Sequence, residues 1–317
     1  MFRRPLLLGL LSPFSCCMNH YYQPSNRFSV GGVLLLLCVG ILAAGLLAFI
    51  YVYAVWYIPF IYINFLLTLV FGFLLGVVLA QLVRTGKLRN PALVTGLATG
   101  VALAACYVQW ALYLTLVLNT TSVESLGRRA SVAHTSFSAD VMMSILLHPG
   151  SIVEAMSELA SSGSWSLMGV TPSGIFLYLI WLVEAAIIVV AAVMLARIQS
   201  TEPFSETANE WAEEEELPVL IAHINDPAAT KMSLEAGDFS ALRPASEDAE
   251  KMFARLKLHC APNDTDCAFL SLENVKVSFD DKGKKSEATT NVVEYLRVSA
   301  QRCQELRSSY RLASVAN

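Results

Sequence analysis

One acidic side chain in a long apolar segment is the residue of this sequence that could most readily do chemistry. Residues 174–196 carry no charge except Glu184, which lies close to the middle. At ~1.5 Å per residue, the segment is long enough to cross the ~30 Å hydrocarbon core of a bilayer as one helix. A carboxylate at that depth costs at least ~2.5 kcal/mol, so we expect it to be neutral, paired, or turned towards water or a partner.

Two other polar residues of apolar segments could meet Glu184. If the last segment runs antiparallel to the third, Gln109 lies within about two helical turns of Glu184 in membrane depth. Thr68 of the second segment lies at a similar depth. We therefore predict an intramembrane polar site formed by Glu184, Gln109 and Thr68. It could link helices by hydrogen bonds, relay protons or ions, or contact a transmembrane helix of another protein. A relay normally needs several ionisable groups in series, and these segments offer one, which favours the structural link.

The sequence lacks the common catalytic and cofactor-binding motifs. It contains no P-loop, no Rossmann glycine pattern, no H-E-x-x-H, no G-x-S-x-G and no C-x-x-C. Cys260 and Cys267, separated by six residues, could ligate a metal or form a disulfide, but no second pair completes a zinc site. In a reducing cytoplasm we expect them to be ordinary thiols. We therefore predict no catalytic residue, no metal site and no cofactor, and enzymatic activity is not expected.

The composition divides the chain into two unlike parts. Of the 317 residues, 55% are hydrophobic and 15% are charged, which is more apolar than an ordinary soluble domain. Residues 198–317 nevertheless hold 21 of the 26 acidic and 13 of the 22 basic residues, a net charge of −8, whereas residues 1–197 have a net charge of +4. We predict a membrane part followed by an acidic soluble part. The acidity argues against nucleic acid as a partner.

Four long segments, of which only the last contains a charged residue, predict four membrane-spanning helices. The fold class expected is therefore an α-helical membrane protein, with a four-helix transmembrane bundle followed by a small soluble α+β domain. We place the spans at about residues 31–52, 61–83, 92–118 and 174–196, with an exterior loop at 119–173.

The joint between the first two spans is rich in aromatic residues. Tyr51, Tyr53, Trp56, Tyr57 and Tyr62 are expected at the level of the lipid headgroups, where amphipathic rings concentrate. Pro59 should end the first helix. The two spans are therefore predicted to form a tight helical hairpin.

Small residues recur at four-residue spacing in the first three spans. Such a stripe makes a shallow groove on one helix face, which lets a second helix approach closely without hydrophobic drive from lipid. We expect the bundle to pack at these faces, either against one another or against a second copy of the chain in a homo-oligomer. The stripes consist of Gly40, Ala44 and Ala48; Gly72, Gly76 and Ala80; and Gly96, Gly100 and Ala104.

Basic residues near the span ends predict the orientation, because Lys and Arg accumulate on the cytoplasmic side. In chain order the flanks carry three, none, three, two and one basic residues. Four spans with both termini in the cytoplasm, in a plasma or inner membrane, fit this count best. Residues 1–27 are then a cytoplasmic leader, 28–197 the membrane domain and 198–317 an acidic cytoplasmic domain. The sequence leaves open whether translation starts at Met1 or Met18.

The loop between the last two spans contains two helix signals. Ser138 could cap a short helix that runs to Leu147 and is ended by residues 148–150. Ser151 and Glu154 have the spacing of a capping box, which would open a second helix.

The C-terminal part predicts a small α+β domain after a polar linker. Residues 287–298 fit either a strand or a helical face, and we prefer a strand followed by a helix capped by Ser299. The other predicted elements are helices near 228–237 and 245–253, strands at 255–260 and 268–279 with a bulge near 273–274, and a turn at 280–285.

These features favour a multi-pass integral membrane scaffold or signalling component in membrane lipid, whose acidic domain, residues 198–317, binds a protein partner. A second class stays open, a small transporter or channel subunit that uses Glu184 as its proton or ion site. An intramembrane enzyme ranks third, because no paired acid, base or nucleophile is visible.

Overall fold

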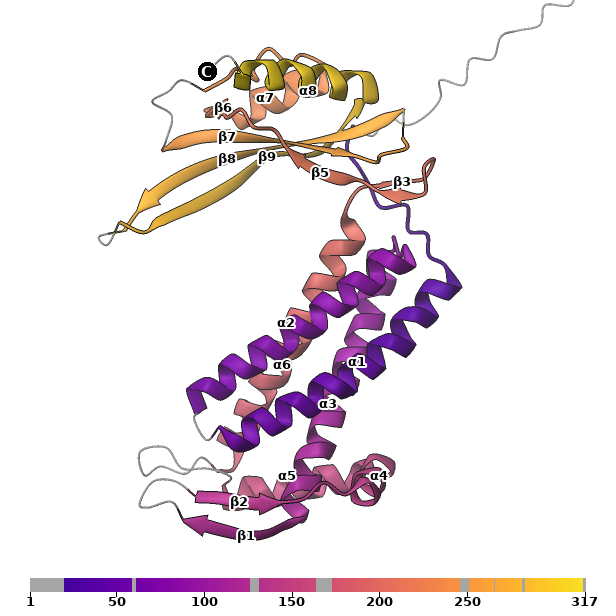
Figure 1. The fold of residues 1–317 in the computed structure, drawn as a ribbon, viewed down its shortest axis with the longest axis vertical. Coiled ribbons are helices and arrows are strands. Elements are labelled where there is room, and N and C mark those ends of the chain that lie inside the picture. Colours follow the sequence, from indigo (N-terminus) through magenta and orange to yellow (C-terminus); the bar gives the residue numbers. More distant parts are fainter. Residues whose placement is uncertain are drawn as a thin grey trace, which may run out of the picture. The chain divides into compact units, whose positions relative to one another are not determined.

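The computed structural model divides the chain into two compact units (Figure 1). The first unit comprises residues 24–202, and the second combines residues 20–23 with residues 203–315. The described residues are 20–58, 61–125, 131–163, 173–245, 251–264, 266–280 and 283–315. Residues 1–19, which include Met18, and Pro59 lie outside the described ranges, and so do the predictions made for them.

Four long helices make up most of the first unit, and each is long and apolar enough to cross a membrane. The first, second and last of them run three to five residues past the C-terminal ends of the predicted spans, whereas the third exceeds its predicted span by Pro91 alone. The Ser29 side chain caps the first helix by accepting a hydrogen bond from Gly32 N–H. The Asn90 side chain caps the third helix by accepting a hydrogen bond from Leu93 N–H. The helices are α1 (Val30–Tyr57), α2 (Ile61–Gly86), α3 (Pro91–Leu118) and α6 (Ile175–Thr201).

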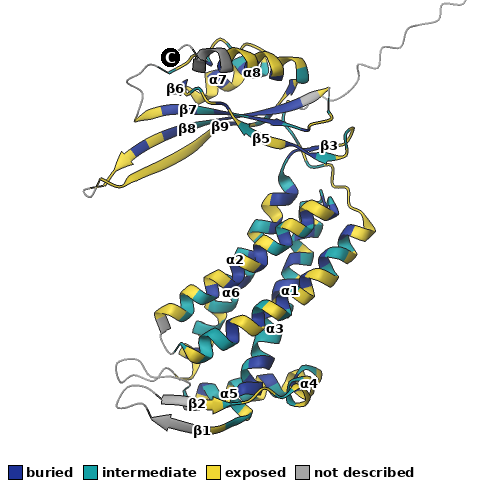
Figure 2. Cartoon of the chain, viewed as in Figure 1, coloured by how far each residue is buried: buried dark blue, intermediate teal, exposed yellow. Residues whose placement is uncertain are grey.

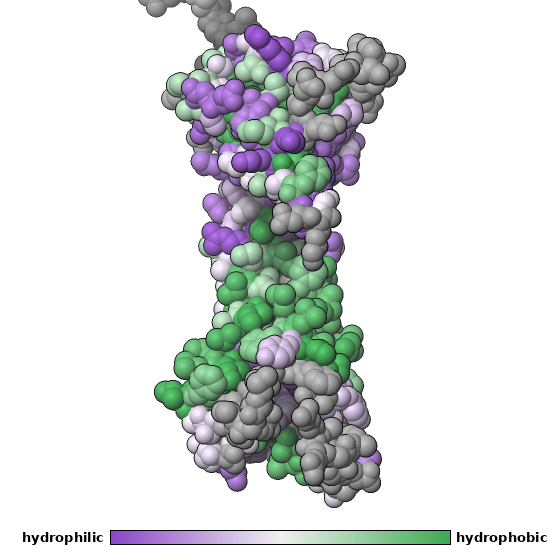
Figure 3. Space-filling model, turned by 90° about the vertical axis from the view of Figure 1, so that its left-hand side faces the viewer, coloured by the Kyte–Doolittle hydropathy of each residue, from purple (hydrophilic) through white to green (hydrophobic). Residues whose placement is uncertain are grey.

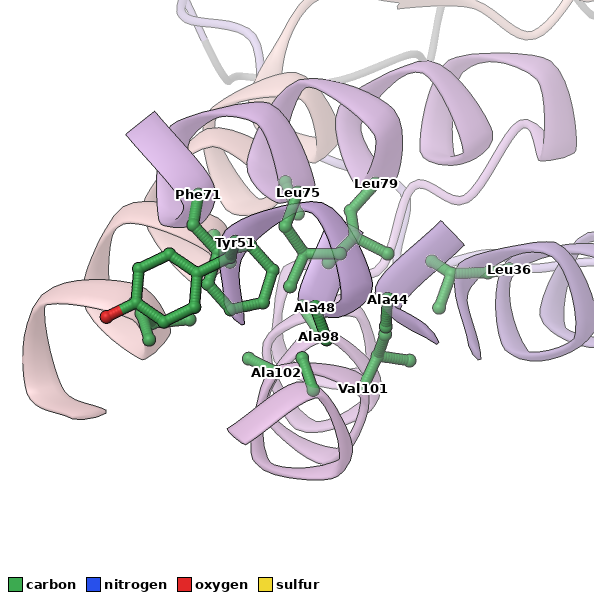
Figure 4. Close-up of a cluster of buried hydrophobic side chains, with 14 of the residues drawn as sticks. Leu36, Ala44, Ala48, Tyr51, Phe71, Leu75, Leu79, Ala98, Val101 and Ala102 are labelled. Carbon is green, nitrogen blue, oxygen red and sulfur yellow. The ribbon is translucent and has the colours of Figure 1, made fainter. Parts of the chain in front are cut away.

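The long helices are apolar on their outer surfaces as well as inside. Leu42 and Leu182 are 73% and 65% exposed, and Figure 3 shows hydrophobic residues covering much of the outside of the helical unit. Helices that are hydrophobic all round are typical of membrane spans or of the centre of a larger protein. The buried side chains drawn in Figure 4 come from α1, α2 and α3: Leu36, Ala44, Ala48, Tyr51, Phe71, Leu75, Leu79, Ala98, Val101 and Ala102.

Small residues bring helices together on two of the three predicted stripes. Gly72 and Gly76 lie so close to α6 that an added Cβ would come within 2.8 Å of Ile188 Cα and 2.9 Å of the Ala191 carbonyl oxygen. Gly40 of α1 faces Leu79 and Val101 side chains at ordinary packing distance or slightly closer. In contrast, no described atom lies within 4 Å of a Cβ built on Gly96 or Gly100, which are exposed. The expected packing at Gly96 and Gly100 is therefore wrong within this chain, since α3 buries another face, which includes Ala98, Ala102 and Ala105.

The segment between α3 and α6 contains a hairpin that the sequence did not signal and two short helices. Ser138 caps α4 as predicted. The capping box at Ser151 is wrong, because α5 begins earlier at Pro149, whose fixed φ and missing N–H suit the first helical position. The elements are β1 (Thr120–Ser125), β2 (Ser131–Thr135), α4 (Ala139–Leu147) and α5 (Pro149–Ser162).

The second unit is built on an antiparallel five-stranded sheet, ordered β5-β7-β8-β9 with β6 also paired to β7. Both helices of this unit lie on one face of the sheet (Figure 1) and cover its largest apolar cluster. A separate two-stranded ribbon joins β3 and β4. The elements are β3 (Phe204–Ser205), β4 (Glu210–Trp211), β5 (Glu213–Glu216), β6 (Ile221–Ala222), α7 (Pro227–Glu235), β7 (Met252–Cys260), β8 (Cys267–Phe279), β9 (Lys285–Ser299) and α8 (Ala300–Val315).

The strand and helix preferred for the C-terminus are confirmed. Residues 285–299 form β9, and Ser299 Oγ accepts a hydrogen bond from Arg302 N–H at the start of α8. The strand predicted at 255–260 is confirmed as part of β7, in which buried and partly exposed residues alternate from Ala254 to Leu258 (Figure 2). The helix expected at 245–253 is wrong at its end, where Met252 and Phe253 begin β7, and residues 246–250 lie outside the described part.

Two further expectations in this unit are corrected. The four glutamates at 213–216, taken as part of a linker, form strand β5, because basic residues pair with their side chains: Glu214 with Lys257, Glu215 with Arg307 and Glu216 with Arg255. The bulge lies in β9 rather than in β8. Leu270 pairs with Leu296, Leu272 with Val293 and Glu273 with Asn291, so β9 has an extra residue at each of these two steps. The second step lies beside the predicted position, and Tyr295, in the first step, has a φ of 53°.

The contrast between α2 and α3 generates a matched test. Gly72→Ala should lower the free energy of unfolding by about 1–3 kcal/mol, because the new methyl group would press on the backbone of α6. Gly100→Ala should raise it by up to ~1 kcal/mol, because the site is open and Ala is the better helix former. Unfolding in mixed micelles measures both. Equal effects of the two substitutions would contradict the packing described for α2.

Candidate functional site

Glu184 lies on α6 and is partly buried within the helical unit. Its carboxylate is close enough to the hydroxyl groups of Tyr51 and Tyr113 for electrostatic interaction. Across the described residues, no hydrogen bond to this carboxylate is formed. The acid is therefore placed beside polar hydroxyl groups from α1 and α3 without being fixed by either of them.

Thr68 takes part in a buried hydrogen-bonded pair. Its Oγ1 lies 2.9 Å from Tyr51 Oη, and it donates to the Asn64 carbonyl oxygen at 2.9 Å. Tyr51 is only 6% exposed, and its ring stacks on Phe71 with 5.0 Å between centroids. Tyr51 therefore points into the bundle, where its hydroxyl group finds a partner, as buried tyrosines generally require; its level in a membrane stays a prediction.

Gln109 is partly buried on α3, and among the described residues no hydrogen bond joins it to Glu184 or Thr68. The predicted trio is thus not a hydrogen-bonded cluster. Tyrosines take the places that Gln109 was expected to fill: Tyr113, one turn further along α3, approaches Glu184, and Tyr51 binds Thr68. The sequence could have indicated these tyrosines, because a buried tyrosine hydroxyl in an apolar helix needs a polar partner.

The chemistry available at this polar group is limited. It contains one carboxyl group and several hydroxyl groups, and no group of three or more His, Cys, Asp or Glu side chains in the described ranges could hold a metal ion. A single acid can exchange one proton, whereas a relay needs further ionisable groups in line. Among the described residues of this group, the hydrogen bond that links two helices is the one between Tyr51 of α1 and Thr68 of α2.

An apolar cavity of about 330 Å³ lies between α3, α5 and α6. Trp110 and Trp181 meet edge to face at 4.9 Å, and Tyr107 donates to the Leu146 carbonyl oxygen at 2.8 Å. Ile152 of α5 packs with the same cluster. No charged side chain lines the cavity, so it suits an apolar chain or ring.

The sheet face opposite α7 and α8 carries paired charges. Arg255 Nε lies 3.1 Å from Glu216 Oε1, and Arg255 Nη2 lies 2.5 Å from Glu287 Oε2. Lys257 Nζ contacts Glu273 at 2.9 Å and Glu214 at 3.2 Å. Hydrogen bonds from Lys285 and Arg255 hold the pKa of Glu287 below its usual value. These cations are neutralised within the domain and are not poised for an acidic ligand.

His259 belongs to the same face but is only 5% exposed. Its Nε2 lies 3.2 Å from Ser271 Oγ, and its ring meets Tyr295 edge-on at 5.0 Å. Burial lowers the pKa of His259 below its ordinary value of 6.5, because the protonated ring loses its hydration; Glu214 and Glu273 oppose this shift and Lys257 adds to it. The ring is therefore a neutral member of the fold near pH 7.

Strand β9 has one edge that other strands do not cover. It ends the order of the sheet, and residues 285–291 are all exposed. Only near its C-terminal half does another segment pair with it: Tyr22 N–H donates to the Tyr295 carbonyl, and Arg297 N–H donates to the His20 carbonyl. Within the described part of the chain, the first half of β9 presents a free backbone edge, which is the usual template for adding a strand.

Comparisons of the chain with protein-family models, with curated proteins and with solved structures find no match. A fold alone would in any case not determine function, which depends on the residues of particular sites. The chemistry of this chain's own residues is therefore the basis for inferring what it does.

The environment of His259 predicts how the stability of the sheet unit depends on pH. Because the folded-state pKa is lowered, the unfolded chain binds more protons near and below pH 6.5. Stability should be fully present above that pH and decrease as the pH falls through 6.5 towards 5. Pulse proteolysis of the full chain in urea would measure this, and His259→Gln, which can keep the bond to Ser271, should flatten the dependence. An unchanged slope in that variant would contradict the assignment.

Proposed function

We propose that this chain is a multi-pass integral membrane scaffold or signalling component whose acidic C-terminal domain binds a protein partner at the free edge of β9. The single observation that carries the proposal is the exposed, unpaired edge of residues 285–291. Exposed edges promote aggregation unless they are short, charged or covered. A long edge at the end of an otherwise well-packed sheet is best accounted for by a strand that a partner supplies.

The hydrogen-bond register defines which backbone groups are available. Asp280 N–H donates to the Lys284 carbonyl oxygen, which makes these two residues a hydrogen-bonded pair. Bonded and non-bonded pairs alternate in an antiparallel ladder. Thr289, which pairs with Val275, is therefore in a non-bonded pair, and its N–H and C=O point away from β8. The partner would form main-chain hydrogen bonds at this position.

The chemistry of the partner follows from the edge and the charge. Strand addition requires an extended segment, and its affinity comes mainly from main-chain hydrogen bonds. The net charge of −8 on residues 198–317 favours a segment from a basic protein, because long-range attraction increases the rate of encounter.

Four membrane crossings with both termini in the cytoplasm are part of the proposal. The described residues 20–22 pair with β9, so the segment before α1 and the domain after α6 belong to one compact unit. This pairing supports an even number of crossings, since an odd number would separate the two ends. The excess of basic residues around the first and third flanks favours the cytoplasmic side of a plasma or inner membrane.

Photocrosslinking in native membranes tests the edge directly. A photoreactive amino acid in place of the exposed Ser286 should give a protein adduct of discrete mass. Thr289→Pro should reduce its yield by about tenfold or more, because proline removes the outward N–H while leaving the bonds to β8. The reduction would be measured by immunoblot of the full-length chain.

Thr289→Val is the matched control, since it keeps the backbone N–H and the β-branched shape. Its adduct yield should equal that of the unsubstituted chain. If Thr289→Pro crosslinks as well as Thr289→Val, the partner does not bind at the edge of β9, and the proposal is wrong.

A transporter or channel subunit is the second candidate, favoured by one observation. Glu184 is partly buried on α6, beside the hydroxyl groups of Tyr51 and Tyr113, without a hydrogen bond from any described residue. An acid in this setting is free to change its protonation state. No second acidic or basic side chain lies beside it in the described helices, which ranks this candidate below the scaffold.

Flux measurements on reconstituted protein distinguish the two candidates. If the chain transports protons or cations, Glu184→Gln should abolish the flux, because the amide keeps the shape of the side chain but cannot ionise. Gln109→Leu should leave the flux intact, since no bond joins Gln109 to Glu184. Proteoliposomes of the unsubstituted chain that show no flux would exclude transport and leave the scaffold as the function.

A further inference from the structure

Two cysteines from distant parts of the sequence meet in the C-terminal unit. Cys260 ends β7 and Cys303 lies in the first turn of α8, 43 residues later, yet their Sγ atoms are 2.8 Å apart. A disulfide bond has a length of about 2.05 Å, so the sulfur atoms need to approach by less than about 1 Å. Cys303 is 2% exposed, and Cys260 is partly exposed. The sequence analysis considered Cys260 with Cys267 and gave no sign of a contact between Cys260 and Cys303.

A partly exposed cation lies beside this pair. Arg307 follows Cys303 by one turn of α8, and its positive charge acts on both sulfur atoms. Its Nη2 contacts Glu215 Oε2 at 2.5 Å, while its Nε is buried and has no hydrogen-bond partner. A buried N–H group without a partner is costly, and a thiolate close to it would satisfy that group.

The two thiol groups are made unequal by their contact. The hydrogen bond from Cys260 and the charge of Arg307 lower the pKa of Cys303, whereas the same contact together with burial raises the pKa of Cys260. This is the division of roles that disulfide formation uses, because one sulfur reacts as the thiolate and the other keeps its proton until the second step.

We propose that Cys260 and Cys303 form an oxidant-responsive disulfide site, with hydrogen peroxide as the oxidant. The Cys303 thiolate attacks one oxygen of the peroxide, the O–O bond breaks, and the departing hydroxide takes up a proton to leave as water. Cys260 then attacks the sulfenic sulfur of Cys303, forming the S–S bond while the S–O bond breaks and the Cys260 proton leaves with the hydroxyl group as a second water. Two thiols are oxidised and one peroxide is reduced.

Closure would tie α8 to the sheet. Leu306 and Tyr310 of α8 cover the apolar core, and Tyr310 Oη donates to the Leu242 carbonyl oxygen at 2.5 Å. In a reducing compartment the two cysteines stay as thiols until an oxidant is present. Once formed, the disulfide bond prevents α8 from separating from the apolar core. Amide exchange in α8 should slow by roughly tenfold or more on oxidation.

The test uses the full chain in membranes, treated with hydrogen peroxide. Free thiols are then blocked in denaturant, the protein is digested without reducing agent, and disulfide-linked peptides are identified by mass spectrometry. The expected result is a Cys260–Cys303 crosslink that a reducing agent removes. Peptides in which both cysteines are alkylated after peroxide, or a crosslink that joins Cys260 to Cys267 instead, would overturn the proposal.

Substitutions provide the controls. Cys267→Ser should form the Cys260–Cys303 crosslink at the same rate, because Cys267 takes no part in it. Cys303→Ser should leave Cys260 alkylated after peroxide and abolish the slowing of α8 exchange. Since the decisive measurement is made on the unsubstituted chain, it does not depend on either variant folding.

Discussion

The cost of leaving polar groups unpaired in apolar surroundings is the constraint on which the helical unit depends. Each long helix satisfies its own backbone groups, so side chains alone decide which faces meet. Glycines at 72 and 76 remove bulk where α2 approaches α6, and Tyr51 and Thr68 satisfy each other's hydroxyl groups in the interior. Glu184 stands out against this background, because no described residue gives its carboxylate a hydrogen bond.

The sheet unit is held together by a different balance. One face is covered by α7 and α8 and buries a large apolar cluster, while the opposite face neutralises its charges in pairs. The acidic run at 213–216 becomes a strand for a similar reason, since three consecutive glutamates each pair with a cation: Glu214 with Lys257, Glu215 with Arg307 and Glu216 with Arg255. One face of the sheet can thus remain open to water. The exposed edge of β9 is the part of the sheet to which a second chain could add a strand.

The exposed edge of β9 and the cysteine pair at α8 lie on consecutive elements of the chain. Strand β9 continues directly into α8 at Ser299, so whatever fixes α8 also restrains the end of β9. The described residues 20–22 occupy the edge of β9 at the same end and leave the other half free. A disulfide at Cys260 and Cys303 would therefore stiffen the covered end of the strand and leave the exposed end available.

The sequence by itself determined the four long apolar helices, the acidic sheet domain and the change from β9 to α8 at Ser299. These features depend on local composition, hydrophobic period and capping, which neighbouring residues encode. Only the tertiary structure decided that Gly72 and Gly76 pack while Gly96 and Gly100 do not, that Tyr51 binds Thr68, and that Cys260 meets Cys303. Such pairings join residues far apart in the chain. Their energies depend on which faces the whole fold brings together, and no local pattern records that choice.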